Sequence, residues 1–256
     1  MKRPFGQHFL FDPNILKKII AVSGVSKSDT VVEIGPGLGT LTKFLAHYAG
    51  RVTAIELDKK LIGKLDDIFG NDRNVEIIQG DAMKFPYETI EGEFRVVANI
   101  PYNITTPLIF KLLEFRDRMP SMTLLMQKEV ARRIIALPGS KEYGVLSIST
   151  QLYTRPSIKF KVSRKAFLPP PKVDSAVVHF EVSPTPLFDV RDEAFFLSVV
   201  KTAFLKRRKM LSNSLKEFEG ITEAMDKAGI DPKVRPEKLS AEDFTRLSNE
   251  LIKGNR

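Results

Sequence analysis

The stretch VVEIGPGLGT, residues 31–40, decides the fold class of this chain. Its first four residues are apolar apart from Glu33, which is typical of a strand buried on both faces of a sheet. The glycines that follow allow the backbone to lie close to a ligand, because glycine has no Cβ. The stretch therefore predicts a buried strand, a glycine-rich turn and the start of a helix.

Short apolar runs and amphipathic stretches alternate on both sides of this unit. Strands alternating with helices predict a parallel sheet that is covered by helices on both faces. The predicted strands are residues 30–34, 52–55, 75–78, 94–98 and 122–126, and the predicted helices are residues 12–23, 38–48, 58–69, 105–116 and 127–137.

The pattern changes towards the C-terminal end. After a predicted helix at residues 142–154, two strand-like runs at 157–162 and 175–182 have no helix between them, which favours an antiparallel pair closing the sheet edge. Pro184 and Pro186 then interrupt regular structure, and the remaining sequence has helical periodicity. We therefore predict two domains: an α/β domain with a seven-stranded sheet at residues 1–183, and a small all-helical domain at 184–256.

Composition narrows the classes of partner. The chain of 256 residues has a formal net charge of +9, which favours a polyanion such as nucleic acid. It contains no cysteine and only three histidines, so we expect no metal site. No unbroken apolar stretch is long enough for a signal peptide or a spanning helix, and we expect a cytoplasmic protein without membrane contact.

Three signals occur at the ends of three successive predicted strands. Gly35 and Gly37 belong to a Gly-x-Gly-x-Gly turn, which lacks the Gly-x-Gly-x-x-Gly spacing typical of nicotinamide enzymes. Glu56, at the next strand end, is suited to accept hydrogen bonds from both hydroxyls of a ribose. Asp81, at the third, is suited to accept one from an adenine amino group. Together they predict a nucleoside cofactor at the carboxyl edge of the sheet.

The fourth strand ends in Asn99-Ile100-Pro101-Tyr102, the most specific motif in the chain. The Asn99 side-chain carbonyl and the Ile100 backbone carbonyl are suited to accept both hydrogens of an adenine N6, stabilising the positive charge that develops when a methyl group arrives. Pro101 keeps Ile100 extended and aims its carbonyl. The Tyr102 ring offers a face on which an extruded base can stack. The motif therefore predicts methylation of an adenine amino group.

Taken together, these motifs resemble the small-subunit ribosomal RNA adenine dimethyltransferase family. The resemblance covers nearly the whole chain and is highly specific. It rests on residues 5–10, 33–40, 56–58, 80–82, 99–102, 127–133, 143–147 and 167–175.

The resemblance implies a Rossmann-like methyltransferase domain that uses S-adenosylmethionine to dimethylate two adjacent adenosines in the 3′-terminal hairpin of small-subunit rRNA. His8 departs from the pattern, since many members have asparagine there. The implied cofactor contacts are His8, Leu10, Gly35, Gly37, Glu56, Leu57, Asp81, Ala82 and Asn99. The implied catalytic residues are Asn99, Ile100, Pro101, Tyr102 and Phe167, with Phe167 as a second aromatic wall beside the target base.

Basic side chains outside these motifs are candidates for RNA contact. Lys206, Arg207, Arg208 and Lys209 follow an apolar helical stripe and are suited to bind phosphates, although a solvated helix end explains the same pattern. Arg132 and Arg133 are further candidates, or surface ion pairs. We expect a monomer that acts on a small-subunit precursor.

Other functions stay open at this stage. A related family that methylates large-subunit rRNA and confers macrolide resistance shares the cofactor motifs and Asn99 to Tyr102, but residues 143–147 and 167–175 favour the small-subunit branch. A ribosome-assembly factor without catalysis is a second alternative, against which the intact motifs argue. A nicotinamide oxidoreductase is disfavoured by the glycine spacing.

Overall fold

The computed structural model describes residues 8–254, and these divide into two compact units. The first unit consists of the described residues up to Ala131 together with Arg155–Thr185. The second consists of Arg132–Thr154 and the described residues from Pro186 onward. The last segment of the first unit thus ends at Thr185, close to the predicted boundary at Ser183. The segment 132–154, which we expected in the α/β domain, groups instead with the C-terminal helices.

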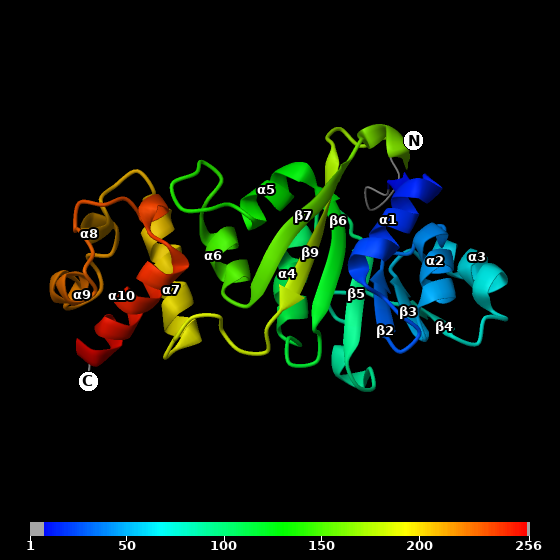
Figure 1. The fold of residues 1–256 in the computed structure, drawn as a ribbon, viewed down its shortest axis with the longest axis horizontal. Coiled ribbons are helices and arrows are strands. Elements are labelled where there is room, and N and C mark those ends of the chain that lie inside the picture. Colours follow the sequence, from blue (N-terminus) through cyan, green and yellow to red (C-terminus); the bar gives the residue numbers. More distant parts are fainter. Residues whose placement is uncertain (1–7, 255–256) are drawn as a thin grey trace. The chain divides into compact units, whose positions relative to one another are not determined.

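The first unit is built on a seven-stranded sheet (Figure 1). The strand order is β4-β3-β2-β5-β6-β9-β7, and the pairs among β4, β3, β2, β5 and β6 are parallel. Strand β9 runs antiparallel to β6 and lies between β6 and β7. The strands are β2 (Thr30–Ile34), β3 (Arg51–Glu56), β4 (Val75–Gln79), β5 (Phe94–Asn99), β6 (Ser121–Gln127), β7 (Thr154–Val162) and β9 (Ser175–Val182).

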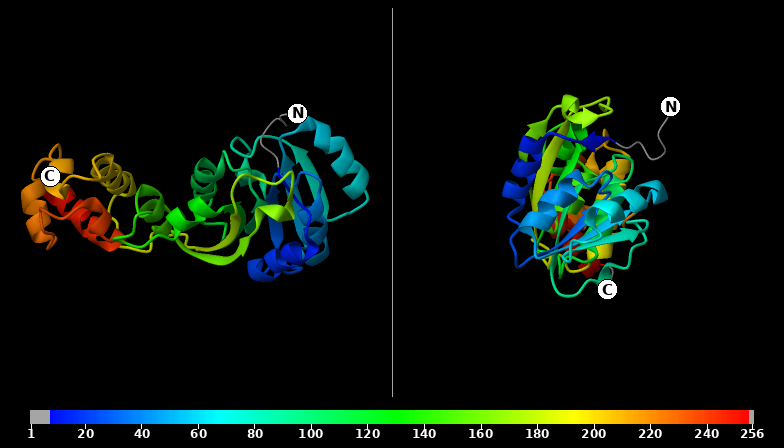
Figure 2. Two further views of the ribbon diagram at one scale, coloured as in Figure 1. Left: turned by 90° about the horizontal axis from the view of Figure 1, so that it is seen from above. Right: turned by 90° about the vertical axis from the view of Figure 1, so that its right-hand side faces the viewer.

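Helices cover both faces of this sheet. Helices α1 (Pro13–Ser23) and α2 (Thr40–Tyr48) pack on one face, where Figure 2 (left) shows α1 in dark blue, and α4 (Thr105–Leu113) lies on the other. Helix α3 (Lys59–Phe69) packs beside β3 and β4. The α/β class and the seven strands predicted from the sequence are confirmed.

Local signals explain where helices α1 and α3 begin and where α1 ends. The Asp12 side chain accepts a hydrogen bond from the Asn14 N–H, and Gly24 ends α1 with a left-handed φ of 64°. Asp58 caps α3 in the same way, accepting from the Lys60 N–H. These caps satisfy backbone donors that have no partner within the helix.

A two-stranded ribbon lies outside the main sheet, and the sequence analysis did not predict it. Strand β1 (Phe9–Leu10) pairs antiparallel with β8 (Phe167–Leu168), placing Phe9 opposite Leu168 and Leu10 opposite Phe167. Leu10 and Phe167 are buried in the core, whereas Leu168 is 65% exposed. The ribbon therefore ties the N-terminal segment to the loop between β7 and β9.

The second unit is helical, as expected for the C-terminal part. Its grouping with residues 132–154 has a packing cause, since the Tyr143 and Phe204 rings lie 6.3 Å apart and Phe204 also covers Gly144. Helix α6 is shorter than predicted at both ends, because it begins only after Gly144 and β7 already begins at Thr154. The helices that lie in this unit are α6 (Val145–Gln151), α7 (Glu193–Leu205), α8 (Leu211–Ser214), α9 (Ile221–Lys227) and α10 (Ala241–Gly254), while α5 (Lys128–Ile134) spans the division at Ala131.

No helix within residues 8–254 combines the length and the apolar character needed to cross a membrane.

Candidate active site

The predicted site residues meet in a cleft at the carboxyl edge of the sheet. The cleft lies where β2, β3, β4 and β5 end, and its volume is about 230 Å³. All the residues implied as cofactor contacts line it: His8, Leu10, Gly35, Gly37, Glu56, Leu57, Asp81, Ala82 and Asn99. Among the implied catalytic residues, those that line it are Asn99, Ile100, Pro101 and Tyr102.

The glycine turn after β2 forms one wall of the cleft. Gly35 and Gly37 have left-handed φ values of 70° and 60°. A Cβ atom added to Gly37 would lie 2.8 Å from the Phe9 ring, closer than any side chain could approach. A Cβ on Gly35 would lie 3.6 Å from Cδ of Pro101. The turn therefore brings the N-terminal ribbon and the Asn99–Tyr102 loop into contact with the same short backbone segment.

Glu56, the last residue of β3, is held in place by backbone donors. Its Oε2 accepts a hydrogen bond of 3.0 Å from the Gly37 N–H, and its Oε1 accepts one of 2.8 Å from the Asp58 N–H. The side chain is only 4% exposed. An ionised carboxylate offers about four acceptor positions, so each oxygen retains capacity for a ligand hydroxyl. The glycine turn and the end of β3 are thereby locked together around the cleft.

Asp81 follows β4 in a short turn. Its Oδ1 accepts a hydrogen bond of 2.9 Å from the Met83 N–H, which fixes the carboxylate at the cleft. The carbonyl of the adjacent Ala82 accepts a hydrogen bond of 3.0 Å from the buried Tyr87 hydroxyl. The position of Asp81 thus depends on the packing of the turn beneath it.

Glu33 is a cleft residue to which the sequence analysis assigned no role. It is 2% exposed, and its Oε2 has no hydrogen-bond partner among the described residues. Burial raises the pKa of Glu33 to about 8, the Thr42 hydroxyl acts against this rise, and the nearby charge of Glu56 acts in the same direction as burial. The floor of the cleft therefore holds a carboxyl group that lacks the backbone donors available to Glu56.

The amide of Asn99 is oriented by the N-terminal segment. Its Nδ2 donates a hydrogen bond of 3.1 Å to the backbone carbonyl of His8. Because a carbonyl can only accept, this contact sets the orientation of the amide and leaves Oδ1 as its acceptor. His8 Nδ1 in turn lies 2.8 Å from the carbonyl oxygen of Pro169. Residues 5–7 of the N-terminal motif lie outside the described part of the chain.

Tyr102 lies in the loop between β5 and α4. Its hydroxyl shares a hydrogen bond of 2.6 Å with Oγ of Ser175, and its ring centroid is 5.7 Å from that of His8. Burial raises the pKa of the Tyr102 hydroxyl, while the hydrogen bond with Ser175 acts in the opposite direction. The phenol is therefore neutral, and its ring borders the cleft.

Phe167 does not line the cleft. Its side chain is 2% exposed and packs in the hydrophobic core with Leu10, its partner across the ribbon. Because Leu10 itself lines the cleft, Phe167 lies one side chain behind that wall. The structure thus brings the other implied catalytic residues together and leaves this ring beneath them.

The basic candidates for RNA contact all belong to the second unit. Arg132 and Arg133 are exposed on α5, and Lys206, Arg208 and Lys209 are exposed after α7. Arg207 differs from these five. Its guanidinium donates to the Ser140 carbonyl at 3.2 Å and lies 3.9 Å from the Glu237 carboxylate. It therefore fixes the loop that contains Ser140, whereas its sequence neighbours project charge into solvent.

Sequence reasoning missed two polar residues that organise the site. Ser175, which the sequence places only at the end of a motif, bonds with Tyr102, and Thr40 donates a hydrogen bond of 2.8 Å to the Leu10 carbonyl. Each partner is distant in sequence, so no local pattern indicates either contact.

Comparisons with known proteins extend over both units. The family description "Ribosomal RNA adenine dimethylase" matches residues 1–253. The ribosomal RNA small subunit methyltransferase A of Streptococcus thermophilus is 43% identical over 98% of this chain and 91% of its own length. The protein of the same name from Moorella thermoacetica is 44% identical over 96% of this chain and 91% of its own.

Solved structures of similar fold include two rRNA-modifying enzymes. A dimethyladenosine transferase from Plasmodium falciparum has a TM-score of 0.79 and 30% identity, covering 97% of this chain and 98% of its own. The 23S rRNA methyltransferase ErmE has a TM-score of 0.74 and 27% identity, covering 95% of this chain and 99% of its own.

Proposed function

The chain belongs to the ribosomal RNA adenine dimethylase family, and from that premise we propose that its cleft dimethylates N6 of two adjacent adenosines in the 3′-terminal hairpin of small-subunit rRNA. The family is the one that the sequence motifs resemble. It establishes an S-adenosylmethionine-dependent enzyme that acts on adenine in rRNA. The target hairpin and the roles of individual residues are our proposal.

One observation supports this proposal above the others. Glu56 and Asn99 end β3 and β5, Asp81 lies in the turn after β4, and all three line a single cleft beside the glycine turn. The carboxyl edge of a parallel sheet is where such folds bind ligands. The carboxylates of Glu56 and Asp81, which suit a nucleoside, thus lie in the same cleft as the Asn99 amide. Transfer of a methyl group from a nucleoside cofactor to a base requires such an arrangement.

The donor and acceptor groups of the cleft fit S-adenosylmethionine. When bound, this cofactor supplies an electrophilic methyl group on a positively charged sulfur. Glu56 retains acceptor capacity for the ribose hydroxyls, and Asp81 is placed to accept from the adenine amino group. Gly37 has no side chain, which lets the Phe9 ring pack against the glycine turn beside the cleft.

Asn99 and Ile100 provide the acceptors for the target amine. The contact with the His8 carbonyl keeps Oδ1 of Asn99 available, and the Ile100 N–H is bound to the Leu125 carbonyl at 3.2 Å. Two acceptors aimed at the N6 hydrogens localise the nitrogen lone pair and stabilise the positive charge that develops on N6. With S-adenosylmethionine bound, these two acceptors would hold N6 towards the methyl group that the cofactor supplies, and the proton that N6 loses would pass to solvent. Alignment of the two reactants supplies much of the remaining acceleration.

Tyr102 provides a stacking face for the extruded base. Its ring borders the same cleft as the proposed nucleoside contact at Asp81. We retain Phe167 as the proposed second wall, because it lies directly behind Leu10 and the adjacent Leu168 is exposed. Contact of this ring with the base requires a change in the ribbon when RNA binds.

The relatives favour the small-subunit substrate. Those that are 43% and 44% identical are named as small-subunit enzymes, whereas the large-subunit enzyme ErmE is 27% identical. The net charge of +9 suits an rRNA partner. We propose phosphate contacts at Arg132, Arg133, Lys206, Arg208 and Lys209, with Arg207 supporting the loop beside them. We also propose that the protein acts as a cytoplasmic monomer, because one chain supplies the whole cleft.

Transfer of labelled methyl groups from S-adenosylmethionine to unmodified ribosomal subunits tests this function. Small and large subunits are assayed in parallel, and the product nucleosides are analysed. We expect N6,N6-dimethyladenosine in the small subunit alone. Label only in the large subunit would support the resistance-type alternative. Tight subunit binding without any label would support an assembly factor.

A further inference from the structure

Ser175 is a buried hydroxyl residue at the substrate side of the cleft, and the family match assigns it no role. It is the first residue of β9, it is fully buried, and its Cα partner is Gln127 at the end of β6. Its side chain shares the hydrogen bond of 2.6 Å with Tyr102. The backbone of Ser175 is therefore fixed by the sheet, while its hydroxyl contacts a residue of a loop.

Ser175 differs from the three residues that follow it along β9. Ala176, Val177 and Val178 are apolar and fully buried. Burying a hydroxyl costs free energy unless it is hydrogen-bonded. Since its partner here is Tyr102, that contact accounts for a serine at the start of this strand.

Tyr102, in contrast, has no strand to hold it. It follows Pro101 in the loop before α4, so the orientation of its ring depends on side-chain contacts. Two such contacts act on the ring: the hydroxyl meets Ser175, and the ring face lies near His8 at an interplanar angle of 30°. A hydrogen bond at the hydroxyl fixes the direction in which the ring axis points. Because a phenolic hydroxyl donates and accepts close to the plane of its ring, the same bond also favours one rotation of the ring about that axis.

We propose that Ser175 is a positioning residue for methyl transfer, whose hydroxyl holds the Tyr102 ring in the orientation that stacks with the target adenine. This inference rests on the proposed function of the cleft. It follows that β9, a strand outside the cofactor-binding half of the sheet, sets the geometry of the base. Methyl transfer requires alignment of N6 with the methyl group, so a tilted ring lowers the rate at saturating substrate.

Three variants isolate this hydrogen bond: Ser175→Ala, Tyr102→Phe and the double variant. Turnover is measured at saturating S-adenosylmethionine and RNA, and the affinity for S-adenosylmethionine is measured separately by calorimetry. We expect each single variant to lower kcat by about tenfold, as loss of one hydrogen bond permits. We expect the double variant to match the single variants, because both remove the same hydrogen bond. Affinity for the cofactor stays unchanged.

A second measurement reports the base directly. An RNA hairpin with 2-aminopurine at the target position fluoresces more strongly when that base is extruded, and stacking on an aromatic ring quenches it. We expect weaker quenching with Ser175→Ala than with the wild type at equal RNA occupancy. Ser121→Ala is the matched control, since Ser121 is also a buried serine of the same sheet and hydrogen-bonds Arg95 at the opposite edge. It should leave kcat and quenching unchanged.

The outcomes separate this inference from the proposed function. Wild-type turnover by Ser175→Ala, or a double variant about a hundredfold slower than the wild type, would overturn the positioning role while wild-type methylation stands. Equal loss in Ser121→Ala would overturn it too, because that result indicates a general effect of buried serines on stability. A wild-type protein that methylates no adenine in rRNA would overturn the proposed function and this inference with it.

Discussion

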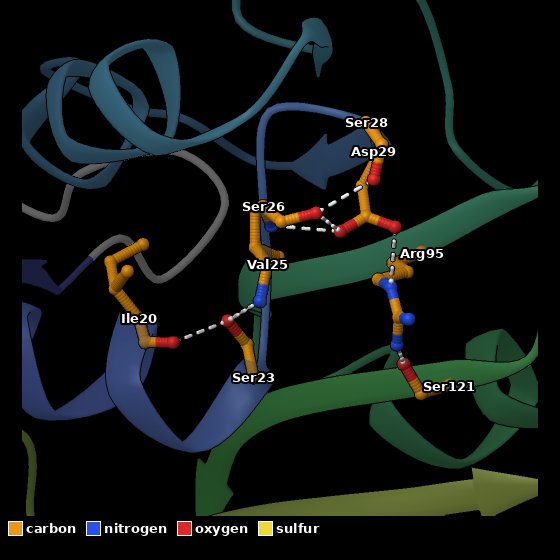
Figure 3. A network of polar contacts seen from close by, with 8 residues as sticks. All are labelled: Ile20, Ser23, Val25, Ser26, Ser28, Asp29, Arg95 and Ser121. Atoms are coloured by element: carbon orange, nitrogen blue, oxygen red, sulfur yellow. Dashed lines mark hydrogen bonds and ion pairs between the residues drawn. The ribbon is translucent and has the colours of Figure 1, made fainter.

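Two carboxyl side chains at opposite ends of β2 lie in contrasting environments. Asp29, just before the strand, accepts hydrogen bonds from the Ser26 N–H at 2.7 Å, the Ser26 hydroxyl at 2.9 Å and the Arg95 guanidinium at 2.9 Å (Figure 3). Burial acts to raise the pKa of Asp29, but its hydrogen bonds with Arg95 and Ser26 outweigh burial and lower it. Glu33, four residues later, has an oxygen without a partner among the described residues, and its pKa is raised to about 8.

The two ends of β2 therefore serve two purposes. At the amino edge, the polar groups satisfy one another, and Arg95 also donates to the Ser121 hydroxyl at 2.8 Å, joining β2, β5 and β6. At the carboxyl edge, Glu33 and the acceptors of Asn99 and Asp81 surround a cleft. We infer that the amino edge contributes to stability, and that the carboxyl edge retains unsatisfied groups for ligands.

Asn99→Ala should have the largest effect and tests the functional side of this comparison. Removing Oδ1 deletes one of two acceptors for the target amine, and loss of a comparable preorganised group lowers kcat by about 100-fold or more. The thermal midpoint should change little, because Asn99 is only partly buried. Methyl transfer and RNA binding are measured on the same preparation. Retained turnover would contradict the assigned role, and loss of RNA binding would indicate a wider disruption.

Glu33→Gln tests the buried carboxyl itself. In the folded wild type Glu33 stays protonated up to its pKa of about 8, while in the unfolded chain it ionises near 4.5. The unfolded state therefore binds fewer protons between these values, and stability falls as pH rises through this window. The glutamine variant lacks this dependence. Between pH 6 and pH 8, the free energy of unfolding of the wild type should fall by about 2 kcal/mol more than that of the variant. Urea denaturation at the two pH values measures both.

Asp29→Asn is the matched control for that pH dependence, with the opposite sign. Because the pKa of Asp29 is lowered, its ionised form adds stability above its ordinary pKa of 3.8, and this stability is lost as pH falls through the lowered value. The asparagine variant should therefore be less stable than the wild type at neutral pH and converge with it in acid. Parallel curves for the two proteins would contradict the contrast between the two ends of β2.

Arg95→Met tests the stabilising side of the comparison. The substitution keeps an apolar stem but removes the donors to Asp29 and Ser121, so we expect a loss of about 1.5 kcal/mol in the free energy of unfolding. Turnover per folded molecule should not change, since the network lies at the edge away from the cleft. Chemical denaturation and active-site-normalised kinetics measure these two quantities.

Arg51→Met provides the control for this substitution. Arg51 pairs with Glu76 at 2.9 Å on the same sheet, but the two side chains are 56% and 49% exposed. Arg95 and Asp29 are 28% and 19% exposed. Exposed ion pairs contribute about 1 kcal/mol or less. Equal losses in the two methionine variants would mean that the network of Asp29 has no special role.

The sequence predicted the carboxyl edge better than the amino edge for a physical reason. Parallel strands end at the same edge, so Glu56, Asp81 and Asn99 converge once the alternation of strands and helices is recognised. The hydrogen bond between Asp29 and Arg95 joins residues 66 positions apart, and no local periodicity indicates that pair. Chemistry concentrated in motifs is therefore visible in the sequence, whereas the pairs that stabilise the sheet are not.

The interactions of β9 and of the ribbon could not be predicted from the sequence either. Ser175 reaches Tyr102 because β9 lies between β6 and β7 in the sheet. The alternation of strands and helices does not specify this strand order. The ribbon pairs two strands of two residues each, too short for a periodic signal. The burial of Phe167 behind Leu10 follows from that pairing, and so its distance from the cleft was not predicted.

The basic tract of the second unit repeats the distinction between paired and available charge. Arg207 is bound to Ser140 and lies near Glu237, while Lys206, Arg208 and Lys209 are exposed. If the exposed residues bind RNA phosphates, replacing them with glutamine removes counterion release without disturbing the fold. Replacing Arg207 disturbs the Ser140 loop instead. Variants of the exposed residues should therefore change RNA binding, whereas variants of Arg207 should change the stability of the second unit.

Neutralising the three exposed residues should have the smallest effect, since solvent-exposed charges are screened by salt. We expect the slope of log affinity against log salt concentration to decrease by about one for each phosphate that the protein no longer neutralises. Arg207→Gln should leave that slope nearly unchanged and lower the thermal midpoint, because it frees a carboxylate that is largely buried. RNA titrations at several salt concentrations measure the slope. If Arg207→Gln alone flattened it, the paired residue would be the one that binds phosphate, and pairing within the unit would no longer distinguish structural from functional charge.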